Sequence, residues 1–371
     1  MNRKDAFGKF AVAPNVRRGG ELEFRLRSLS RFFDALRSEF RSRTGLPFKT
    51  RFRALRLGFS SRAWMLCQLD ENDPALYLAD LKAVWRGYHV NGFYNPVLAN
   101  KLLLSRLLSA LGAPHPAVVA MVVNGRLYDA DGSSDPDPVE TLQCSLERHP
   151  QQVYRPALAG NGEGIFFLRH DGSGLTLNGS KTSVNEVCRL LSGLNGYLGT
   201  EYVQQAAYAR QIFDGSTNTL RILTLWDEKT DSPFVAALVH RFGSERSGLT
   251  DHWHQGHGGV CAAVDRETGK MGPAASLSDD GQLSWTSRHR DSGALIEGVE
   301  IPGLRACLTA VLEVASRFPF CPSIGWDVVL QDEGFSIIEA NTSQGLSIMQ
   351  IHEPLLKDPR TRAFYRRWGM A

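Results

Sequence analysis

Apolar residues in the first part of the chain recur three or four positions apart, which is the period of an amphipathic helix. In the stretch FRLRSLSRFFDALRSEFRSR the residues that follow this spacing are Phe24, Leu26, Leu29, Phe32, Phe33, Leu36 and Phe40. About the first 90 residues are therefore predicted to be mostly helical. A further helix is predicted to begin at the N-cap residue Asn95 and to stop at Gly112 and Pro114.

Beyond Pro116 the pattern changes to short apolar runs separated by turn residues, which is typical of β-strands. The run AVVAMVVNGRLYDA predicts a hairpin that turns at Asn124-Gly125, and strands are expected on both sides of the glycine-rich stretch ALAGNGEGIFF. Further strands follow up to residue 265, then a helix over residues 303–317 and a last hairpin. Helices mixed with antiparallel hairpins predict an α+β fold rather than a doubly wound α/β sheet.

The last predicted hairpin, IGWDVVLQDEGFSIIEANTSQG, places polar residues close together on strand-like runs 324–330 and 335–341. A three-residue loop over 332–334, with Gly334 in the left-handed conformation, would set Asp327 opposite Glu339. Asn341 would share the strand face of Glu339 because it lies two residues further on. Facing carboxylates repel each other, and a divalent cation held by these oxygen atoms would remove the repulsion. A surface hairpin with scattered polar residues is the alternative interpretation.

The composition is ordinary for a globular protein, since 43% of the 371 residues are hydrophobic and 22% are charged. This length leaves room for two or three subdomains. No apolar run resembles a signal peptide or a membrane span. The six cysteines are far apart and form no Cys-x-x-Cys pair, so a reduced, cytoplasmic setting is expected.

The net charge of +3 hides an asymmetry along the chain. Residues 1–66 contain 16 Lys and Arg against 5 Asp and Glu, a balance of +11, which leaves −8 for the remainder. Such a basic arm could bind nucleic acid, an anionic membrane or an acidic partner. It could equally be a solvated helical face that docks on the acidic remainder of the same chain.

The glycine-rich stretch could hold an anion. Gly160, Gly162 and Gly164 have no Cβ, so their backbone N–H groups could approach a phosphate closely. Strands are predicted on both sides, whereas Walker A loops and Rossmann turns open a helix, and an ordinary hairpin loop is the alternative. Arg155 lies just upstream and Lys101 is on the preceding helix, so two cations could meet the same phosphates.

The order of these elements over residues 90–350 resembles the ATP-grasp superfamily, in particular its sugar-transfer-associated branch. The matching phrases, in chain order, are NKLLLSRLLSALGAPHP, VYRPALAGNGEGIFFL, LGTEYVQQ, STNTLRILTL, HGGVCAAVDRETG and the final hairpin. Two departures stand out, because Arg155 replaces the usual lysine and Asp251-His252 stands where the branch tends to have Asp-Asn. The usual ribose-binding carboxylate has no clear counterpart.

The resemblance implies an ATP-grasp fold, in which two α+β subdomains clasp ATP, with an extra basic helical region. The implied divisions are residues 1–90 for the helical region, 91–200 for the small subdomain with the glycine flap, and 201–371 for the C-terminal subdomain with the metal site. The implied ATP contacts are Lys101, Arg155, Gly160, Gly162, Gly164, Glu201, Tyr202 and Val203, with Gln204 or Gln205 near the ribose. The implied Mg²⁺ ligands are Asp327, Glu339 and Asn341, and Mn²⁺ could substitute.

The activity that the resemblance implies is an ATP-dependent carboxylate–amine ligase that forms an amide through an acyl phosphate. Lys101 and Arg155 would orient the γ-phosphoryl group, and Arg221 would stabilise charge in the acyl transition state. Asn218 would lie near the phosphate or the reacting centre. The partners would be a small-molecule carboxylate and an amine, with sugar-linked and peptide substrates included. A phosphotransferase with a hydroxyl acceptor and a non-enzymatic nucleic-acid or membrane binder are the alternatives.

Several histidines offer further candidate contacts. His252, His254 and His257 could bind zinc, contact the substrate or be ordinary loop residues. His289 and Arg290 could reach an acidic group of the substrate, or could mark the end of a surface strand.

Overall fold

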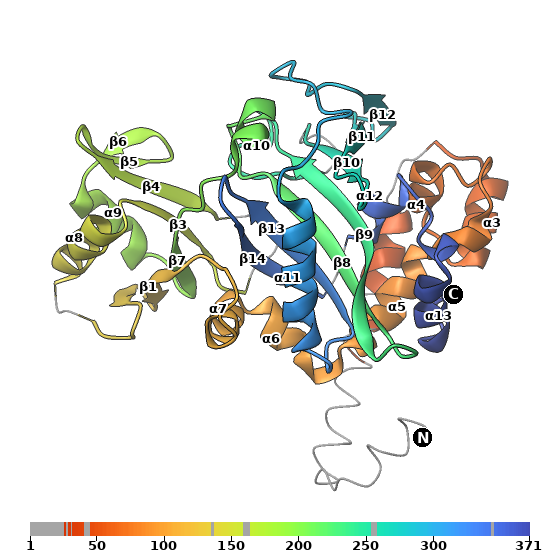
Figure 1. Ribbon diagram of the computed structural model, residues 1–371, viewed down its shortest axis with the longest axis horizontal. Helices are drawn as coiled ribbons and strands as arrows, with labels where there is room; N and C mark the ends of the chain where they lie inside the picture. The colour runs from red at the N-terminus through yellow and green to blue at the C-terminus, as the bar shows by residue number, and fades with distance from the viewer. Residues whose placement is uncertain are drawn as a thin grey trace, which may run out of the picture. The chain divides into compact units, whose positions relative to one another are not determined.

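The computed structural model describes residues 26, 29–30, 32–40, 45–134, 137–158, 164–253, 258–342 and 345–371. These residues belong to two compact units (Figure 1). Unit 1 combines the chain up to Phe93 with the C-terminal segment Glu353–Ala371, and unit 2 runs from Tyr94 to His352. The C-terminal segment therefore joins the N-terminal helices, whereas the division into 1–90, 91–200 and 201–371 stays a prediction.

Unit 1 is helical in its described part, as the apolar spacing predicts. Besides residues 32–40, its helices are α3 (Phe48–Leu57), α4 (Ser61–Leu66), α5 (Asp80–Val90) and α13 (Pro359–Arg367), with the 3₁₀ turns η1 (Pro74–Leu76) and η3 (Leu355–Lys357). Its core forms around Phe59, Trp64 and Leu69. The buried carboxylate of Glu39 accepts a hydrogen bond from the Ser61 N–H at 2.8 Å, which ties residues 32–40 to α4. The predictions for residues 1–25 lie outside the described residues.

Unit 2, which begins at the last residue of the 3₁₀ turn η2 (Gly92–Tyr94), contains a seven-stranded antiparallel sheet in the order β2-β1-β7-β3-β4-β5-β6. Its strands are β1 (Val118–Val123), β2 (Arg126–Asp129), β3 (Gln151–Pro156), β4 (Phe166–Asp171), β5 (Gly174–Leu177), β6 (Ser180–Thr182) and β7 (Tyr197–Glu201). The helices α8 (Pro138–Arg148) and α9 (Val184–Ser192) cover one face, where Leu142 and Val187 join Tyr154 in a core. Arg155 follows Tyr154 directly and so points to the opposite face.

The second sheet of unit 2 is also antiparallel and has the order β12-β11-β10-β9-β8-β13-β14. Its strands are β8 (Thr219–Asp227), β9 (Ser232–Phe242), β10 (Val260–Val264), β11 (Met271–Leu277), β12 (Leu283–Thr286), β13 (Ser323–Leu330) and β14 (Phe335–Asn341). The helix α11 (Leu304–Ser316) lies across one face (Figure 1), where Val311 shares a core with Ile222 and Trp326. Two antiparallel sheets with helices confirm the predicted α+β class.

The remaining helices in the described part of unit 2 are α6 (Asn95–Ala99), α7 (Lys101–Ala110), α10 (Ala207–Ile212) and α12 (Leu346–Gln350). The single helix predicted from Asn95 is in fact interrupted at Asn100, which caps α7 (Lys101–Ala110) by accepting hydrogen bonds from the N–H groups of Leu102 and Leu103 at 3.0 and 3.1 Å. Lys101 is therefore the first residue of α7. The cap fixes its backbone, and the Lys101 N–H also donates to the Ala157 carbonyl at 3.0 Å.

The final hairpin has the predicted pairing but reaches it by a different route. Asp327 lies opposite Glu339, as expected. The loop has four residues rather than three, because Leu330 pairs with Phe335, and a β-bulge at Ile338 restores the register. For the same reason Ile337 joins the core, whereas strict alternation back from Glu339 would have placed Ile338 there.

No helix among the described residues is both long and apolar enough to span a bilayer. All six cysteines fall within the described ranges, and none of them forms a disulfide.

The predicted hairpin between β1 and β2 is confirmed, and its turn gives a test of the fold. Asn124 and Gly125 have φ values of 50° and 75°, as a two-residue type I′ turn requires. A Cβ on Gly125 would also come within 2.4 Å of the Ser192 carbonyl oxygen.

We expect Gly125→Ala to lower the free energy of unfolding by about 1–3 kcal/mol, because the turn needs a left-handed residue at a crowded position. Gly87→Ala is the matched control, since Gly87 lies in α5 with nothing within 4 Å of a Cβ. This control should raise stability by about 0.5–1 kcal/mol. Urea denaturation measures both variants, and equal effects would contradict the assigned turn.

Candidate functional site

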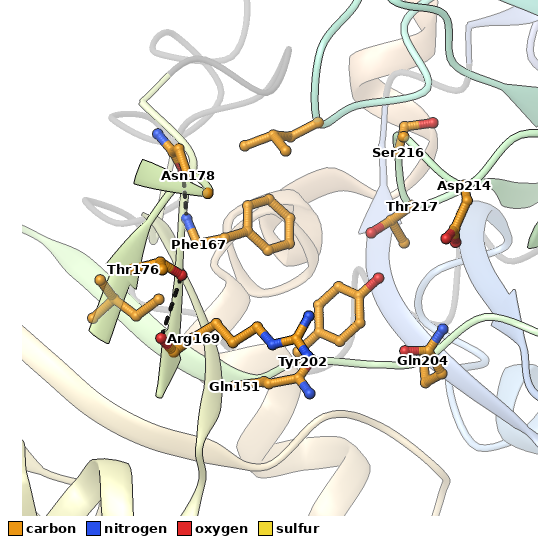
Figure 2. A pocket seen from close by; sticks show the side chains of 14 residues that line it. Gln151, Phe167, Arg169, Thr176, Asn178, Tyr202, Gln204, Asp214, Ser216 and Thr217 are labelled. Carbon is orange, nitrogen blue, oxygen red and sulfur yellow. Dashed lines mark hydrogen bonds between the residues drawn. The ribbon is translucent and has the colours of Figure 1, made fainter. Parts of the chain in front are cut away.

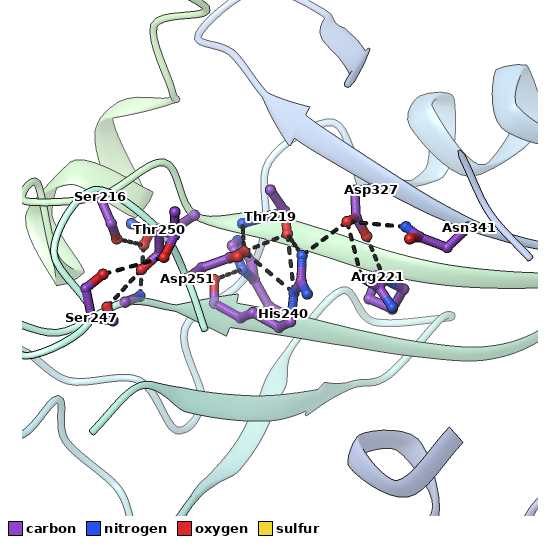
Figure 3. A network of polar contacts seen from close by, with 12 residues as sticks. Ser216, Thr219, Arg221, His240, Ser247, Thr250, Asp251, Asp327 and Asn341 are labelled. Atoms are coloured by element: carbon purple, nitrogen blue, oxygen red, sulfur yellow. Dashed lines mark hydrogen bonds and ion pairs between the residues drawn. The ribbon is translucent and has the colours of Figure 1, made fainter. Parts of the chain in front are cut away.

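A strip of polar side chains crosses the face of the second sheet that α11 does not cover. The strands set its order, because Arg221 on β8 pairs with Asp327 on β13, and Asp327 pairs with Glu339 on β14. On the other side, Thr219 of β8 pairs with Arg241 of β9. Directly paired residues point to the same face of a sheet. Figure 3 shows the resulting network, with Asp327, Arg221 and Asn341 at one end.

The buried carboxylate of Asp327 is the centre of the strip. Arg221 approaches it with two nitrogens: Nε contacts Oδ1, and Nη2 donates to Oδ2 at 2.9 Å. Arg241 Nη2 lies 3.1 Å from Oδ2, and Asn341 Nδ2 donates to the same atom at 3.3 Å. Burial alone would raise the pKa of Asp327, but the charges of Arg221 and Arg241 outweigh it and hold this pKa below its usual value.

Arg241 and Asp251 are two members of the strip that sequence reasoning missed as site residues. Arg241 Nε lies 3.3 Å from Asp251 Oδ2, and its Nη2 donates to the Thr219 hydroxyl at 2.6 Å. Asp251 Oδ2 also accepts from the Thr219 N–H at 3.0 Å. Burial raises the pKa of Asp251, although Arg241 opposes this shift. An arginine directly before the buried end of the apolar strand FVAALVHRF was the signal that could have found it.

Lys101 meets the other carboxylate of the hairpin. Its Nζ lies 3.2 Å from Glu339 Oε1, and the lysine side chain is 6% exposed against 25% for Glu339. Burial lowers the pKa of Lys101, and Glu339 offsets part of this shift. Because α7 starts at Lys101, the helix end holds the ammonium group beside the hairpin.

Arg155 reaches the same hairpin from the first sheet. Its Nη2 donates to the Ile338 carbonyl at 3.1 Å. Its Nε is buried and has no hydrogen-bond partner among the described residues. Burial also lowers the pKa of the Arg155 guanidinium. A buried cationic donor without a partner is a place where an anionic ligand oxygen would be stabilised.

The flap beyond Arg155 is described only in part, since Gly160 and Gly162 lie outside the described residues. Gly164 has a φ of 74°, and a Cβ there would come within 2.4 Å of the Tyr197 hydroxyl. No other residue type fits this position without a shift of Tyr197.

A pocket of about 320 Å³ lies where the first sheet meets the segment after β7. Figure 2 shows Phe167 and Tyr202 facing the loop that carries Asp214, Ser216 and Thr217. The two rings meet edge to face with centroids 5.7 Å apart. Burial raises the pKa of Tyr202, and the charge of Asp214 raises it further. The remaining lining residues are Gln151, Leu168, Arg169, Thr176, Asn178, Gly179, Gln204, Gly215 and Leu249.

Gln204 and Gln205, the two residues predicted to lie near the ribose, have different environments in the segment after β7. Gln204 lines the pocket, and neither Gln204 nor Asp214 makes a side-chain hydrogen bond to another described residue. Gln205 is instead buried: its amide donates to the Ser216 carbonyl at 2.8 Å and accepts from the Asn218 N–H at 3.0 Å. Asp214 is a pocket carboxylate that sequence reasoning missed. In the sequence, α10 lies between Asp214 and the segment LGTEYVQQ, which supplied the other predicted nucleotide contacts.

Other predicted residues have partners inside the protein. Glu201 Oε1 accepts from the Ala117 N–H at 2.9 Å, and Val203 is buried. Asn218 is buried and donates to the Phe213 carbonyl at 2.6 Å. His289 is buried, bonds the Gly243 carbonyl at 2.8 Å and stacks on Phe213, which favours a structural role over substrate contact.

Arg290, the neighbour of His289, is exposed. His252 lies partly buried after Asp251, whereas His254 and His257 lie outside the described residues. No group of three or more His, Cys, Asp or Glu side chains within the described ranges could hold a metal. The predicted metal set differs from such a group, because it consists of two carboxylates and the amide oxygen of Asn341.

These hard oxygen donors suit Mg²⁺, which binds proteins through one or two carboxylates. The partnerless Nε of Arg155 and the ammonium of Lys101 suit the phosphates of a nucleotide. The residues present therefore fit both ATP and a divalent metal.

An α+β chain with two antiparallel sheets and cations beside a carboxylate hairpin has the arrangement of the ATP-grasp superfamily. The sequence matches the sugar-transfer associated ATP-grasp family over residues 89–362, and the chain belongs to this family. The resemblance noted from the sequence is thereby confirmed, and membership indicates an ATP-binding enzyme. No curated protein matches the sequence.

The solved structures similar to this chain include two ligases and a synthetase. D-alanine–D-alanine ligase from Bacillus anthracis is 10% identical with a TM-score of 0.38, covering 77% of this chain and 71% of that one. The ligase PsnB, complexed with a minimal precursor, is 13% identical with a TM-score of 0.38, covering 77% and 68%. D-alanyl-alanine synthetase A from Vibrio cholerae is 10% identical with a TM-score of 0.41, covering 74% and 66%.

The two hairpin carboxylates should respond differently to loss of charge. We expect Asp327→Asn to lower the free energy of unfolding by about 3 kcal/mol or more, because it leaves Arg221 and Arg241 buried without their shared anion. Glu339→Gln should cost only about 1 kcal/mol, since the amide oxygen can still accept from Lys101. Chemical denaturation measures both.

The matched control is Glu333→Gln in the exposed turn of the same hairpin, which should stay within about 0.5 kcal/mol of the wild type. A loss for Asp327→Asn no larger than that of Glu339→Gln would show that the two arginines do not depend on Asp327.

Proposed function

We propose that this protein is an ATP-dependent carboxylate–amine ligase that forms an amide through an acyl phosphate. The observation that carries the proposal is the meeting of four cations with the oxygen ligands of one hairpin. Lys101 and Arg155 reach Glu339 and Ile338, while Arg221 and Arg241 reach Asp327. Such an arrangement stabilises the negative charge of phosphates and of an oxyanion.

The pocket lined by Phe167 and Tyr202 is the proposed position of the nucleoside. The rings of Phe167 and Tyr202 would contact the base, and Leu249 lines the same pocket. Asp214 and Gln204 would bind the ribose hydroxyls, since both are polar pocket groups without a side-chain hydrogen bond inside the described protein. The volume of about 320 Å³ is within the range of small-molecule sites.

Arg155 and Lys101 would hold the phosphates. Arg155 would use its partnerless Nε, and its guanidinium offers two nitrogens where a lysine offers one. The metal ligands would be Asp327, Glu339 and Asn341. A Mg²⁺ ion there would neutralise phosphate charge, and Mn²⁺ would be the substitute to test.

The reaction would proceed in two displacements. A carboxylate oxygen of the first substrate attacks the γ-phosphorus of ATP, the bond to the bridging oxygen breaks, and ADP leaves. The amine nitrogen of the second substrate then attacks the acyl carbon, phosphate leaves with the oxygen, and the nitrogen loses a proton. Arg221 would stabilise the tetrahedral oxyanion that exists between the attack of the amine and the departure of phosphate. Arg241 would hold Asp327 in place beside Arg221.

A phosphotransferase remains the second candidate function. The cations and the hairpin ligands would serve a hydroxyl acceptor as well as a carboxylate, because both reactions share the ATP site. The substrates proposed for the ligase are a small carboxylate and an amine, with sugar-linked and peptide compounds included.

Nucleotide binding is tested by a thermal shift with ATP, with and without Mg²⁺. At about a hundredfold over its Kd, ATP should add ~2.7 kcal/mol to the stability of the wild type. Glu339→Gln should lose the magnesium-dependent part of this gain, and Glu333→Gln should keep it. A gain in Glu339→Gln equal to that of the wild type would remove the hairpin from the proposed metal site.

Hydroxylamine separates the ligase from the phosphotransferase. An acyl phosphate reacts with it to give a hydroxamate, whereas a phosphoester is stable, so incubation with ATP, Mg²⁺ and candidate carboxylates should yield a coloured ferric hydroxamate. Arg221→Met should reduce the yield by a factor of roughly 100 or more, because it removes a group that stabilises the transition state. ATP consumption that produces a phosphoester and no hydroxamate would identify the phosphotransferase.

A further inference from the structure

Four phenylalanine side chains of unit 1 lie largely in solvent. Phe33, Phe40, Phe48 and Phe52, here called the phenylalanine surface, are 61%, 78%, 83% and 63% exposed. Phenylalanine is normally buried, and gathered exposed apolar groups mark interaction sites. Their occurrence within twenty residues of sequence therefore calls for a partner.

Helix geometry gathers these side chains in pairs. Phe48 and Phe52 are one turn apart on α3, and Phe33 and Phe40 are two turns apart in the helical residues 32–40. The two helices are bound together, because Arg51 Nη2 donates to the Glu39 carbonyl at 2.8 Å and lies 3.2 Å from the Glu39 carboxylate. Phe40 directly follows Glu39 in the sequence, and Phe52 directly follows Arg51. The four rings are thus carried by one tied pair of helices.

The charge around the phenylalanine surface is positive. Residues 45–66 contain five basic residues and no acidic one. Lys49, Arg53 and Arg56 are exposed on α3 among the phenylalanines. Among the described residues between 32 and 66, Asp34 is the one exposed acidic side chain, because Glu39 is buried.

We infer that the phenylalanine surface docks this protein on an anionic membrane. Phenylalanine rings enter the boundary between headgroups and acyl chains, while lysine and arginine meet the lipid phosphates. Single-stranded nucleic acid also binds aromatic and basic groups, but it runs through grooves, whereas α3 presents the convex side of a helix. The docking is independent of the proposed reaction, whose residues all belong to unit 2.

The test is co-sedimentation of the full-length protein with vesicles of phosphatidylcholine containing about one-third phosphatidylglycerol. The wild type should bind these vesicles, and should bind pure phosphatidylcholine far more weakly. The double variant Phe48→Ser/Phe52→Ser should bind at least about tenfold more weakly, because two rings no longer leave water. Lys49→Gln/Arg56→Gln should also bind more weakly and lose part of the dependence on salt.

Phe93→Ser is the matched control, because Phe93 is 63% exposed but lies outside the phenylalanine surface, and it should bind as the wild type does. Exposed substitutions should leave the unfolding temperature unchanged, which separates lost docking from lost folding. Equal vesicle binding by Phe48→Ser/Phe52→Ser and the wild type would overturn the inference. Binding of a single-stranded oligonucleotide that anionic vesicles do not displace would overturn it too.

Discussion

The ion pairs of Asp327 are the constraint on which the site depends. Two arginines from adjacent strands converge on this one buried carboxylate, and its charge offsets much of the cost of burying theirs. The pairing also fixes how the strands carry their polar residues, since Arg221, Asp327 and Glu339 stand side by side in the ladder. A loss of Asp327 would therefore disturb both the charge and the geometry of the strip.

The charge balance of the strip favours an anionic ligand. Four cations, Lys101, Arg155, Arg221 and Arg241, face three carboxylates, Asp251, Asp327 and Glu339. Asp327 accepts from Arg221, Arg241 and Asn341, and a carboxylate offers about four lone-pair sites in all. A metal ion bound at Asp327 would displace at least one of these donors, and an arginine so displaced would be released toward the anion. Metal binding and phosphate binding at the proposed site would be coupled through this exchange.

Sequence reasoning found the parts of the site that are encoded locally. Hairpin turn residues and strand alternation predicted that Asp327 lies opposite Glu339. Local rules of the same kind could also have predicted that Asn100 caps a helix. It missed Arg241, because the role of an arginine inside an apolar strand cannot be assigned until its partner on another strand is known. It also left Gln204 and Gln205 equivalent. Their difference comes from the buried Asn218 and Ser216, which bind Gln205 across more than ten residues of sequence.

The bulge at Ile338 shows why the rest could not be read from the pattern alone. A four-residue loop by itself would shift the register of β14 by one position and turn Glu339 to the opposite face. The extra residue corrects this shift, so the predicted pairing holds although the predicted loop does not. It also leaves Ile338 outside the ladder, and the Ile338 carbonyl is the group to which Arg155 donates. One irregular residue thus sets which face of the hairpin carries Glu339, and its carbonyl anchors Arg155. Both roles depend on a backbone distortion that apolar periodicity does not encode.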